Sequence, residues 1–222
     1  YSLVLLPFYL QKSWLIAREK GQYGAAVLAC HLTLFCAVIT FFYLPFIDIG
    51  DRAFEGLKTY SMDWQSNDSL FAILLFFLKD IFRFGVDTEI PVLGNSMLLA
   101  KSIMALVLLT IITYLLVKKT PSADSPKGLM QNLFLVMTLV FLISPVQNPW
   151  YLSWLVPFLC FFHSRALILL TGLIGLYYLD FYFDYQEMTQ YSFWIVWSEY
   201  IPFYIYLIWE LTRSKNNCTI QK

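Results

Sequence analysis

Two long apolar segments restrict what this chain can fold into more than any other feature of its sequence. Ala25–Phe46 carries no charged residue, and Met97–Val117 carries only Lys101. A helix needs about 20 residues to cross the hydrocarbon core of a bilayer, where the backbone must satisfy its own hydrogen bonds. Each segment is therefore predicted to be a membrane-spanning helix.

Five further apolar segments are shorter or more aromatic, and they extend the same prediction. They are Tyr1–Leu10, Leu129–Ser144, Pro149–Phe162, Ala166–Phe181 and Ser192–Leu211. The sequence thus predicts an all-α fold, a polytopic transmembrane helical bundle of six to seven spans that forms one domain over residues 1–222. The composition agrees, because 59% of the residues are apolar and only 14% are charged. Such a chain is neither a nucleic-acid-binding module nor an ordinary soluble enzyme.

The first residues read as the end of a span that has already begun. Tyr1–Leu10 has no initiator Met and no basic segment before its apolar run, so it lacks the pattern of a signal peptide. We therefore expect the chain to be the C-terminal part of a longer protein. Its expected neighbours are the missing N-terminal spans of the same protein and membrane lipids.

The 15 basic and 15 acidic residues cancel in number but not in position. The apolar part of Ser69–Gly85 is too short to cross a membrane, since it runs into Lys79, Asp80 and Arg83. If this segment stays on one side, the opposite side gathers ten basic residues: Lys12, Arg18, Lys20, Lys118, Lys119, Lys127, Arg165, Arg213, Lys215 and Lys222. The positive-inside rule places that side, with the C-terminus, in the cytoplasm. We expect an outer loop over residues 47–96 that contains an interfacial or re-entrant helix over 69–85.

The first polar stretch that can carry chemistry lies in this outer loop, just before the expected interfacial helix. Asp63, Trp64, Asn67 and Asp68 are concentrated there. One interpretation is structural: a side chain among residues 66–69 caps the helix, and the tryptophan sits at the interface. The other is a polar shelf for a sugar, with Trp64 stacked on its face and Asn67 or Asp68 binding hydroxyls. Asp63 and Asp68 are the candidate catalytic bases, since that role needs a carboxylate aimed at the attacking hydroxyl.

The second polar stretch is a turn between two expected spans. Pro145 ends one helix, and Pro149 fits the first turn of the next, where its missing N–H costs nothing. Gln147 and Asn148 lie between them, with both amides at the membrane surface. Three aromatic residues follow: Trp150, Tyr151 and Trp154. The turn is either a tight helical hairpin with an aromatic belt or a sugar-binding site formed by Gln147, Asn148 and the first two aromatics.

These two stretches together resemble bacterial GT-C-fold glycosyltransferases, the polyprenyl-phosphate-dependent mannosyltransferases and their multispanning relatives. The resemblance is carried by Pro-x-x-x-Pro-Trp-Tyr-Leu-x-Trp at Pro145–Trp154 and by Trp64-x-x-Asn-Asp-Ser-Leu-Phe71. Leu44-Pro-Phe46 and Phe54-x-Gly-Leu57 precede the latter. In this family the residue before Pro-Trp-Tyr is often His, where this chain has Asn148. The resemblance implies a catalytic Asp in an earlier outer loop, upstream of this chain.

The cations of the outer side are candidate ligands for a lipid phosphate. They are Lys58, Lys79, Arg83 and Lys101, the last just inside an expected span. An ionisable residue within a span is costly and functional by default, although a lysine near a helix end also snorkels to the interface. Both interpretations of Lys101 remain open, and Lys79 and Arg83 are also compatible with a solvated helix end.

A third outer element, residues 177–185, is a ladder of aromatic residues with Asp180 and Asp184 one helical turn apart. Carboxylates at this spacing share a helix face and suit a cation or an acid–base pair. An aromatic interface girdle with two solvated acids explains the same pattern, and we favour it. No His, Cys or carboxylate spacing typical of a metal site and no glycine-rich phosphate loop occurs, so we expect no metal and no cofactor.

The resemblance implies an enzyme of the bacterial inner membrane that acts on the periplasmic or extracellular face. It would transfer a hexose, mannose by analogy, from a polyprenyl-phosphate donor to an acceptor, with the lipid-linked sugar donor as its substrate. The alternatives are a transporter or channel and a noncatalytic membrane scaffold subunit. The spans carry few polar residues and no pair of broken helices at mid-membrane, which disfavours the transporter.

Overall fold

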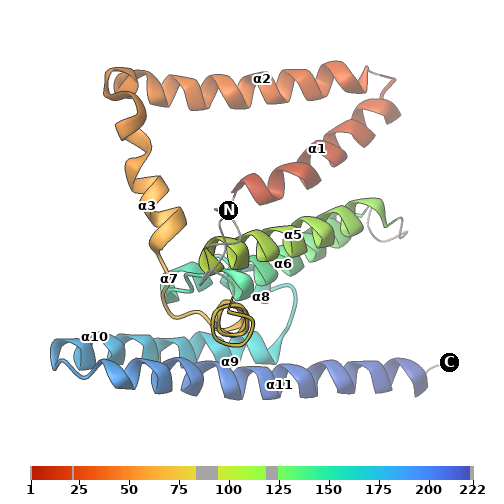
Figure 1. Ribbon diagram of the computed structural model, residues 1–222. Coiled ribbons are helices and arrows are strands. Elements are labelled where there is room, and N and C mark those ends of the chain that lie inside the picture. Colours follow the sequence, from red (N-terminus) through yellow and green to blue (C-terminus); the bar gives the residue numbers. More distant parts are fainter. Residues whose placement is uncertain (1, 22, 84–94, 119–124, 221–222) are drawn as a thin grey trace. The chain divides into compact units, whose positions relative to one another are not determined.

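The computed structural model describes residues 2–21, 23–83, 95–118 and 125–220 (Figure 1). In these residues every regular element is a helix, and the one β-type contact is an isolated bridge between Ser66 and Val146. The predicted all-α class is therefore confirmed for this part of the chain.

Four helical stretches of the described residues are long and apolar enough to cross a membrane. They are Gly24–Thr59, Ser96–Val117, Pro126–Ile143 and Arg165–Tyr185. Each overlaps one of the segments predicted as a span, and these helices are compatible with an integral membrane protein. The count of six to seven crossings and the GT-C architecture stay predictions.

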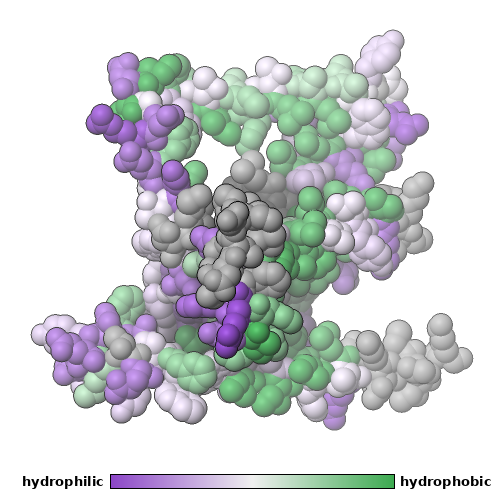
Figure 2. Space-filling view, in the orientation of Figure 1, coloured by the Kyte–Doolittle hydropathy of each residue, from purple (hydrophilic) through white to green (hydrophobic). Residues whose placement is uncertain are grey.

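The first of these stretches combines three helices: α2 (Gly24–Tyr43), the 3₁₀ helix η1 (Leu44–Phe54) and α3 (Glu55–Asp63). With 20 residues at about 1.5 Å per residue, α2 is long enough to cross the core of a bilayer. Its large apolar side chains face outward, Phe41 and Phe42 being 67% exposed. Figure 2 shows such hydrophobic residues along the visible side of α2. An exposed apolar surface of this kind fits contact with lipid rather than water.

The described contacts divide the chain into two units, and the first comprises Tyr1–Trp64 and Leu109–Val136. In it α1 (Ser2–Glu19) packs against α2. Gly24 permits this close approach, because a Cβ there would lie 2.8 Å from the Trp14 ring. The Gln11 amide donates to the Leu116 carbonyl oxygen over 2.8 Å and links α1 to the end of α5 (Ser96–Val117).

The second unit comprises Gln65–Leu108 and Met137–Lys222. Its main contact joins α11 (Ser192–Ile220) to the antiparallel stretch formed by α9 (Arg165–Leu173), η3 (Ile174–Leu176) and α10 (Tyr177–Tyr185) (Figure 1). Glu210 of α11 accepts from the Ser164 hydroxyl (3.2 Å) and from the Arg165 and Ala166 backbone N–H groups (3.0 Å each). A carboxylate thus satisfies the free donors at the start of α9.

The short helix that the sequence predicts over 69–85 is present from Leu70 to Ile81. It consists of α4 (Leu70–Phe76) and a π-helical turn, η2 (Phe77–Ile81), while 84 and 85 lie outside the described residues. Phe71 and Leu78 are buried with Ala100 of α5, which anchors the helix. Ser69 occupies the N-cap position, but its side chain makes no capping bond, so its hydroxyl serves another purpose.

The segment Pro149–Phe162 differs from the single spanning helix that the sequence predicts. It contains two four-residue helices, α7 (Pro149–Leu152) and α8 (Val156–Leu159), which follow α6 (Pro126–Ile143). Between them the Ser153, Trp154 and Leu155 N–H groups each bond to the carbonyl three residues earlier. Pro157 has no N–H to donate at this point, and that favours the irregular turns. As predicted, α6 ends before Pro145, and Pro149 begins α7.

Candidate functional site

The two polar stretches of the sequence are joined by a backbone bridge. The Ser66 N–H donates to the Pro145 carbonyl oxygen, and the Gln147 N–H donates to the Ser66 carbonyl oxygen, each over 2.9 Å. Both stretches are extended here because Pro145 cannot continue α6 and Asn148 precedes a proline. The structure therefore brings the segment before α4 into direct contact with the turn before α7.

Asn67 is the centre of a buried polar cluster at this bridge. Its backbone has a φ of 51°, a left-handed conformation that asparagine tolerates better than most residues. Its side-chain amide donates to the Glu199 carboxylate over 2.9 Å and to the Gln147 carbonyl oxygen over 3.2 Å. Asn67 is 7% exposed and Glu199 is fully buried. A loop residue, a turn residue and a residue of α11 are thus linked through one amide.

Gln147 and Ser69 extend the cluster toward α11. The Gln147 side-chain amide donates to the Leu142 and Ser144 carbonyl oxygens at the end of α6 (2.9 and 3.0 Å). Its own oxygen accepts from the Ser69 hydroxyl over 3.4 Å, and that hydroxyl lies 2.7 Å from the Tyr204 hydroxyl. Gln147 and Ser69 have no exposed surface, so their contacts hold the bridge rather than a ligand.

Asn148 and Tyr177 connect the bridge to α10. The Ser66 hydroxyl donates to the Asn148 side-chain oxygen over 3.5 Å and lies 3.3 Å from the Tyr177 hydroxyl. Asn148 is 3% exposed. The predicted pair of amides is therefore buried beneath the site and supports it.

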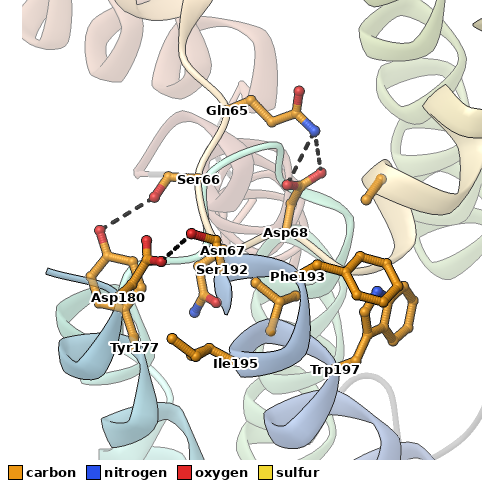
Figure 3. A pocket seen from close by; sticks show the side chains of 12 residues that line it. Gln65, Ser66, Asn67, Asp68, Tyr177, Asp180, Ser192, Phe193, Ile195 and Trp197 are labelled. Atoms are coloured by element: carbon orange, nitrogen blue, oxygen red, sulfur yellow. Dashed lines mark hydrogen bonds between the residues drawn. The ribbon is translucent and has the colours of Figure 1, made fainter. Parts of the chain in front are cut away.

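A cavity of about 340 Å³ opens beside this cluster (Figure 3). Its polar lining comes from the loop before α4 and from the α10–α11 pair: Gln65, Ser66, Asn67, Asp68, Tyr177, Asp180 and Ser192. Phe193, Ile195 and Trp197 supply much of its apolar wall. The Gln65 amide donates to both Asp68 carboxylate oxygens (3.2 and 3.1 Å), and the Ser192 hydroxyl donates to Asp180.

Burial raises the pKa of Asp68 from its usual 3.8 to about 6, although the hydrogen bond from Gln65 lowers it in part. Asp68 lies in the loop before α4, outside the apolar helices, and is 7% exposed. A carboxylate with a pKa near neutrality accepts a proton more readily than an ordinary aspartate. Asp68 therefore presents to the cavity a carboxylate that is more basic than an ordinary aspartate.

The remaining sugar-binding candidates do not line this cavity. Trp64 follows α3 in the first unit and is 52% exposed. Trp150 lies edge-to-face with Tyr177, their ring centres 6.4 Å apart, and Tyr151 is stacked on Trp154 at 4.9 Å. Asp63 ends α3, and its side chain lies outside the described residues.

Within the second unit, the candidate phosphate ligands do not share one site. Lys101 lines a mainly apolar groove of about 180 Å³ with Phe71, Met104, Ala105 and Leu108 on one side. Residues 140 and 143–145, at the end of α6, form the other side. Three remain elsewhere: Lys79 and Arg83 are exposed near the end of η2, and Lys58 is exposed on α3 in the first unit.

Several residues of the site are absent from the sequence-based candidates. The most central is Glu199, and Tyr177, Asp180, Ser192 and Tyr204 also contribute. Glu199 had a usable signal, because a carboxylate inside an aromatic segment predicted to span a membrane is a functional candidate by default. Asp180, which we assigned to an aromatic girdle, instead lines the cavity, whereas Asp184 is exposed.

In the part of the chain that the structure describes, no group of three or more His, Cys, Asp or Glu side chains has the arrangement of a metal site. Comparison with protein-family models, with curated proteins and with solved structures finds no match to this chain. In the described residues, the fold is helical, with helices compatible with a membrane and a cavity lined by carboxylates.

Proposed function

We propose that the chain belongs to a membrane glycosyltransferase of GT-C architecture. It transfers a hexose, mannose in the first instance, from a polyprenyl phosphate to an acceptor at the outer face of the inner membrane. The observation that carries the proposal is the bridge between Ser66 and Val146. It unites the two motif segments, 80 residues apart at Asn67 and Gln147, around a cavity with carboxylates and aromatic walls.

The groove beside Lys101 supports the lipid-linked donor. Its described lining is nearly all apolar, which suits a polyprenyl chain, and Lys101 is the one charged residue among these described residues. A cation in the lining of an apolar groove matches the chemistry of a lipid phosphate. The groove reaches Pro145, whose carbonyl oxygen accepts from Ser66, so it borders the bridge that also borders the cavity.

The reaction is a displacement at the anomeric carbon of the donor. The acceptor hydroxyl oxygen attacks that carbon, and the bond from the carbon to the phosphate oxygen breaks. The phosphate leaves with the bonding electrons, and Asp68, in place of the upstream Asp that the family resemblance implies, takes the proton of the hydroxyl. The raised pKa of Asp68, caused by burial, matches this role, and general-base catalysis contributes about 10²–10⁴-fold in rate.

A transfer assay with radiolabelled polyprenyl-phosphate mannose tests the proposal on membranes that contain the protein. We expect sugar transfer to an endogenous or added glycan acceptor, and a loss of at least about 100-fold in Asp68→Asn. Asp80→Asn is the matched control, because Asp80 is an exposed aspartate of the neighbouring π-helical turn outside the cavity lining.

Thermal unfolding in detergent shows whether each variant is folded. If folded wild-type protein transfers no sugar from the labelled donor, the proposed function is wrong. If Asp68→Asn and Asp80→Asn retain the same activity, Asp68 is not the base.

A further inference from the structure

The cavity beside Asp68 has an unusual charge for a protein that handles phosphates. Two carboxylates, Asp68 and Asp180, line it, and among the described residues its lining includes no Lys, Arg or His. We infer that this cavity binds the acceptor, and that it accepts a neutral or positively charged carbohydrate residue while excluding an anionic one. That the bound sugar is the acceptor rests on the proposed function, whereas the charge preference of the cavity rests on its lining alone.

The two carboxylates are held by neutral partners. Asp68 accepts from the Gln65 amide, and Asp180 accepts from the Ser192 hydroxyl. A phosphate or a uronic acid placed among these groups would face like charges in a partly enclosed space, where screening by water is weak. Hydroxyl and ammonium groups, in contrast, donate to carboxylates.

A second observation indicates that the ligand of this cavity donates hydrogen bonds. Asn67 lines it, is 7% exposed, and its side-chain oxygen is buried without a hydrogen-bond partner. A buried acceptor left unpaired costs about 1–3 kcal/mol, so such groups are normally satisfied. Because this oxygen has no exposed surface, a carbohydrate hydroxyl in the cavity would satisfy it after a small shift of the Asn67 amide.

The walls and the volume also fit a sugar ring. Trp197 and Phe193 of α11 lie across the cavity from the polar groups of the loop (Figure 3). Aromatic faces favour the apolar C–H face of a sugar and cationic groups over anions. A volume of about 340 Å³ lies at the lower end of small-molecule sites, which suits one monosaccharide unit rather than a long glycan or a lipid.

Direct binding measured without any donor tests the inference. Isothermal titration calorimetry on the detergent-solubilised protein uses four probes: methyl α-mannopyranoside, glucosamine, glucuronate and mannose 6-phosphate. We expect the first two to bind and the two anions to bind at least tenfold more weakly. In Asp180→Asn that discrimination shrinks, because one of the two repelling charges is gone while the amide still accepts from Ser192.

Matched controls lie on the same helices. Asp184→Asn removes the exposed acid one turn from Asp180, and Trp194→Ala removes an exposed tryptophan outside the lining. We expect Trp197→Ala to weaken binding of the neutral probe about tenfold and Trp194→Ala to leave it unchanged.

The inference is overturned if no probe binds, if the anions bind as well as the neutral sugar, or if the control variants match the cavity variants. Its failure is separable from that of the proposed function. Selective binding without sugar transfer would leave a carbohydrate site on a protein that is not this enzyme. Sugar transfer without selective binding would support the proposed enzyme but would show that this cavity is not its acceptor site.

Discussion

Two cavities described in the second unit differ in the charge and polarity of their linings, although both are lined by residues of α4. The one beside Asp68 is lined by two acids, amides, hydroxyls and aromatic rings, whereas the one beside Lys101 is nearly all apolar and holds a single cation. Both border α4, the first through Ala72 and the second through Phe71. Neighbouring residues on one short helix thus face two chemically opposite environments.

Under the proposed function, this difference would keep two unlike substrates apart. A phosphate on an apolar tail is attracted to the lysine-bearing groove and repelled by the acid-lined cavity, while a hydrophilic sugar gains little from the groove. The bridge at Ser66 separates the two and is supported by the buried cluster around Asn67. Variants that affect one cavity and not the other therefore test the division.

The largest effect is expected from Asn67→Ala. It removes the Asn67 amide that donates to the buried Glu199 carboxylate, and it places alanine, which disfavours a positive φ, at a φ of 51°. We expect the free energy of unfolding to fall by about 3 kcal/mol, from the lost hydrogen bonds and the strained backbone together. Chemical denaturation in detergent measures this. Asn67→Gly relieves the strain alone, so a full recovery in that variant would contradict the role of the amide.

The next effect is a pH dependence confined to the acid-lined cavity. Burial raises the pKa of Asp68 to about 6, so the base loses its negative charge below that pH, and turnover should fall about tenfold per pH unit. The contribution of Asp68 to the free energy of unfolding changes with pH in the opposite direction. Between about pH 4 and 6 the folded protein keeps a proton that the unfolded chain has lost, so this contribution is full below pH 4 and is lost as the pH rises to 6.

A pH–rate profile checks this prediction, with the KM for the lipid-linked donor measured in parallel. That KM should stay flat from pH 5 to 7, because Asp68 does not line the groove that we assign to the donor. A profile in Asp68→Asn with the same inflection near 6 would assign the titration to another group.

Lys101→Gln is expected to act on the other cavity only. Removal of the cation should raise the KM for the polyprenyl-phosphate donor about tenfold, which corresponds to about 1.4 kcal/mol, and should leave sugar binding to the acid-lined cavity unchanged. Steady-state kinetics with varied donor measures it. Lys118→Gln, just beyond the other end of α5, is the control, and an equal effect there would point to a general loss of surface charge.

The smallest effect is expected from Glu199→Gln. The glutamine oxygen can still accept from the Asn67 amide, and no charge remains buried. We expect the free energy of unfolding to change by less than about 1 kcal/mol and both cavities to keep their ligands. A loss as large as that of Asn67→Ala would mean that the negative charge itself holds the cluster.

The local part of the fold could be predicted from the sequence, because it depends on residues that are close in the chain. Met97–Val117 is apolar over a membrane thickness and becomes α5, and the prolines at 145 and 149 bound the turn as expected. The regular span expected over Pro149–Phe162 fails for a local reason too, since Pro157 interrupts the hydrogen-bond ladder.

The two polar segments of the site could be predicted from the sequence, but the contacts between them could not. The stretches around Asn67 and Asn148 were recognisable because turn chemistry concentrates polar residues between apolar segments. Their amides were expected to face a sugar. Most of them instead form buried contacts within the protein, which no local sequence pattern reveals. Glu199 joins Asn67 across 132 residues, and only the packing of α11 determines that contact.

The distance along the chain between Asn67 and Glu199 also sets the order in which the protein can mature during synthesis. A ribosome adds about 5–20 residues per second, so on the order of 10 s passes between the appearance of the two partners. In that interval α4, α5 and α6 are already made, yet the amide of Asn67 has no carboxylate to bind. A nascent chain that stalls before α11 would contain both sequence motifs but no assembled site. Synthesis of α11 is therefore the step that completes the site.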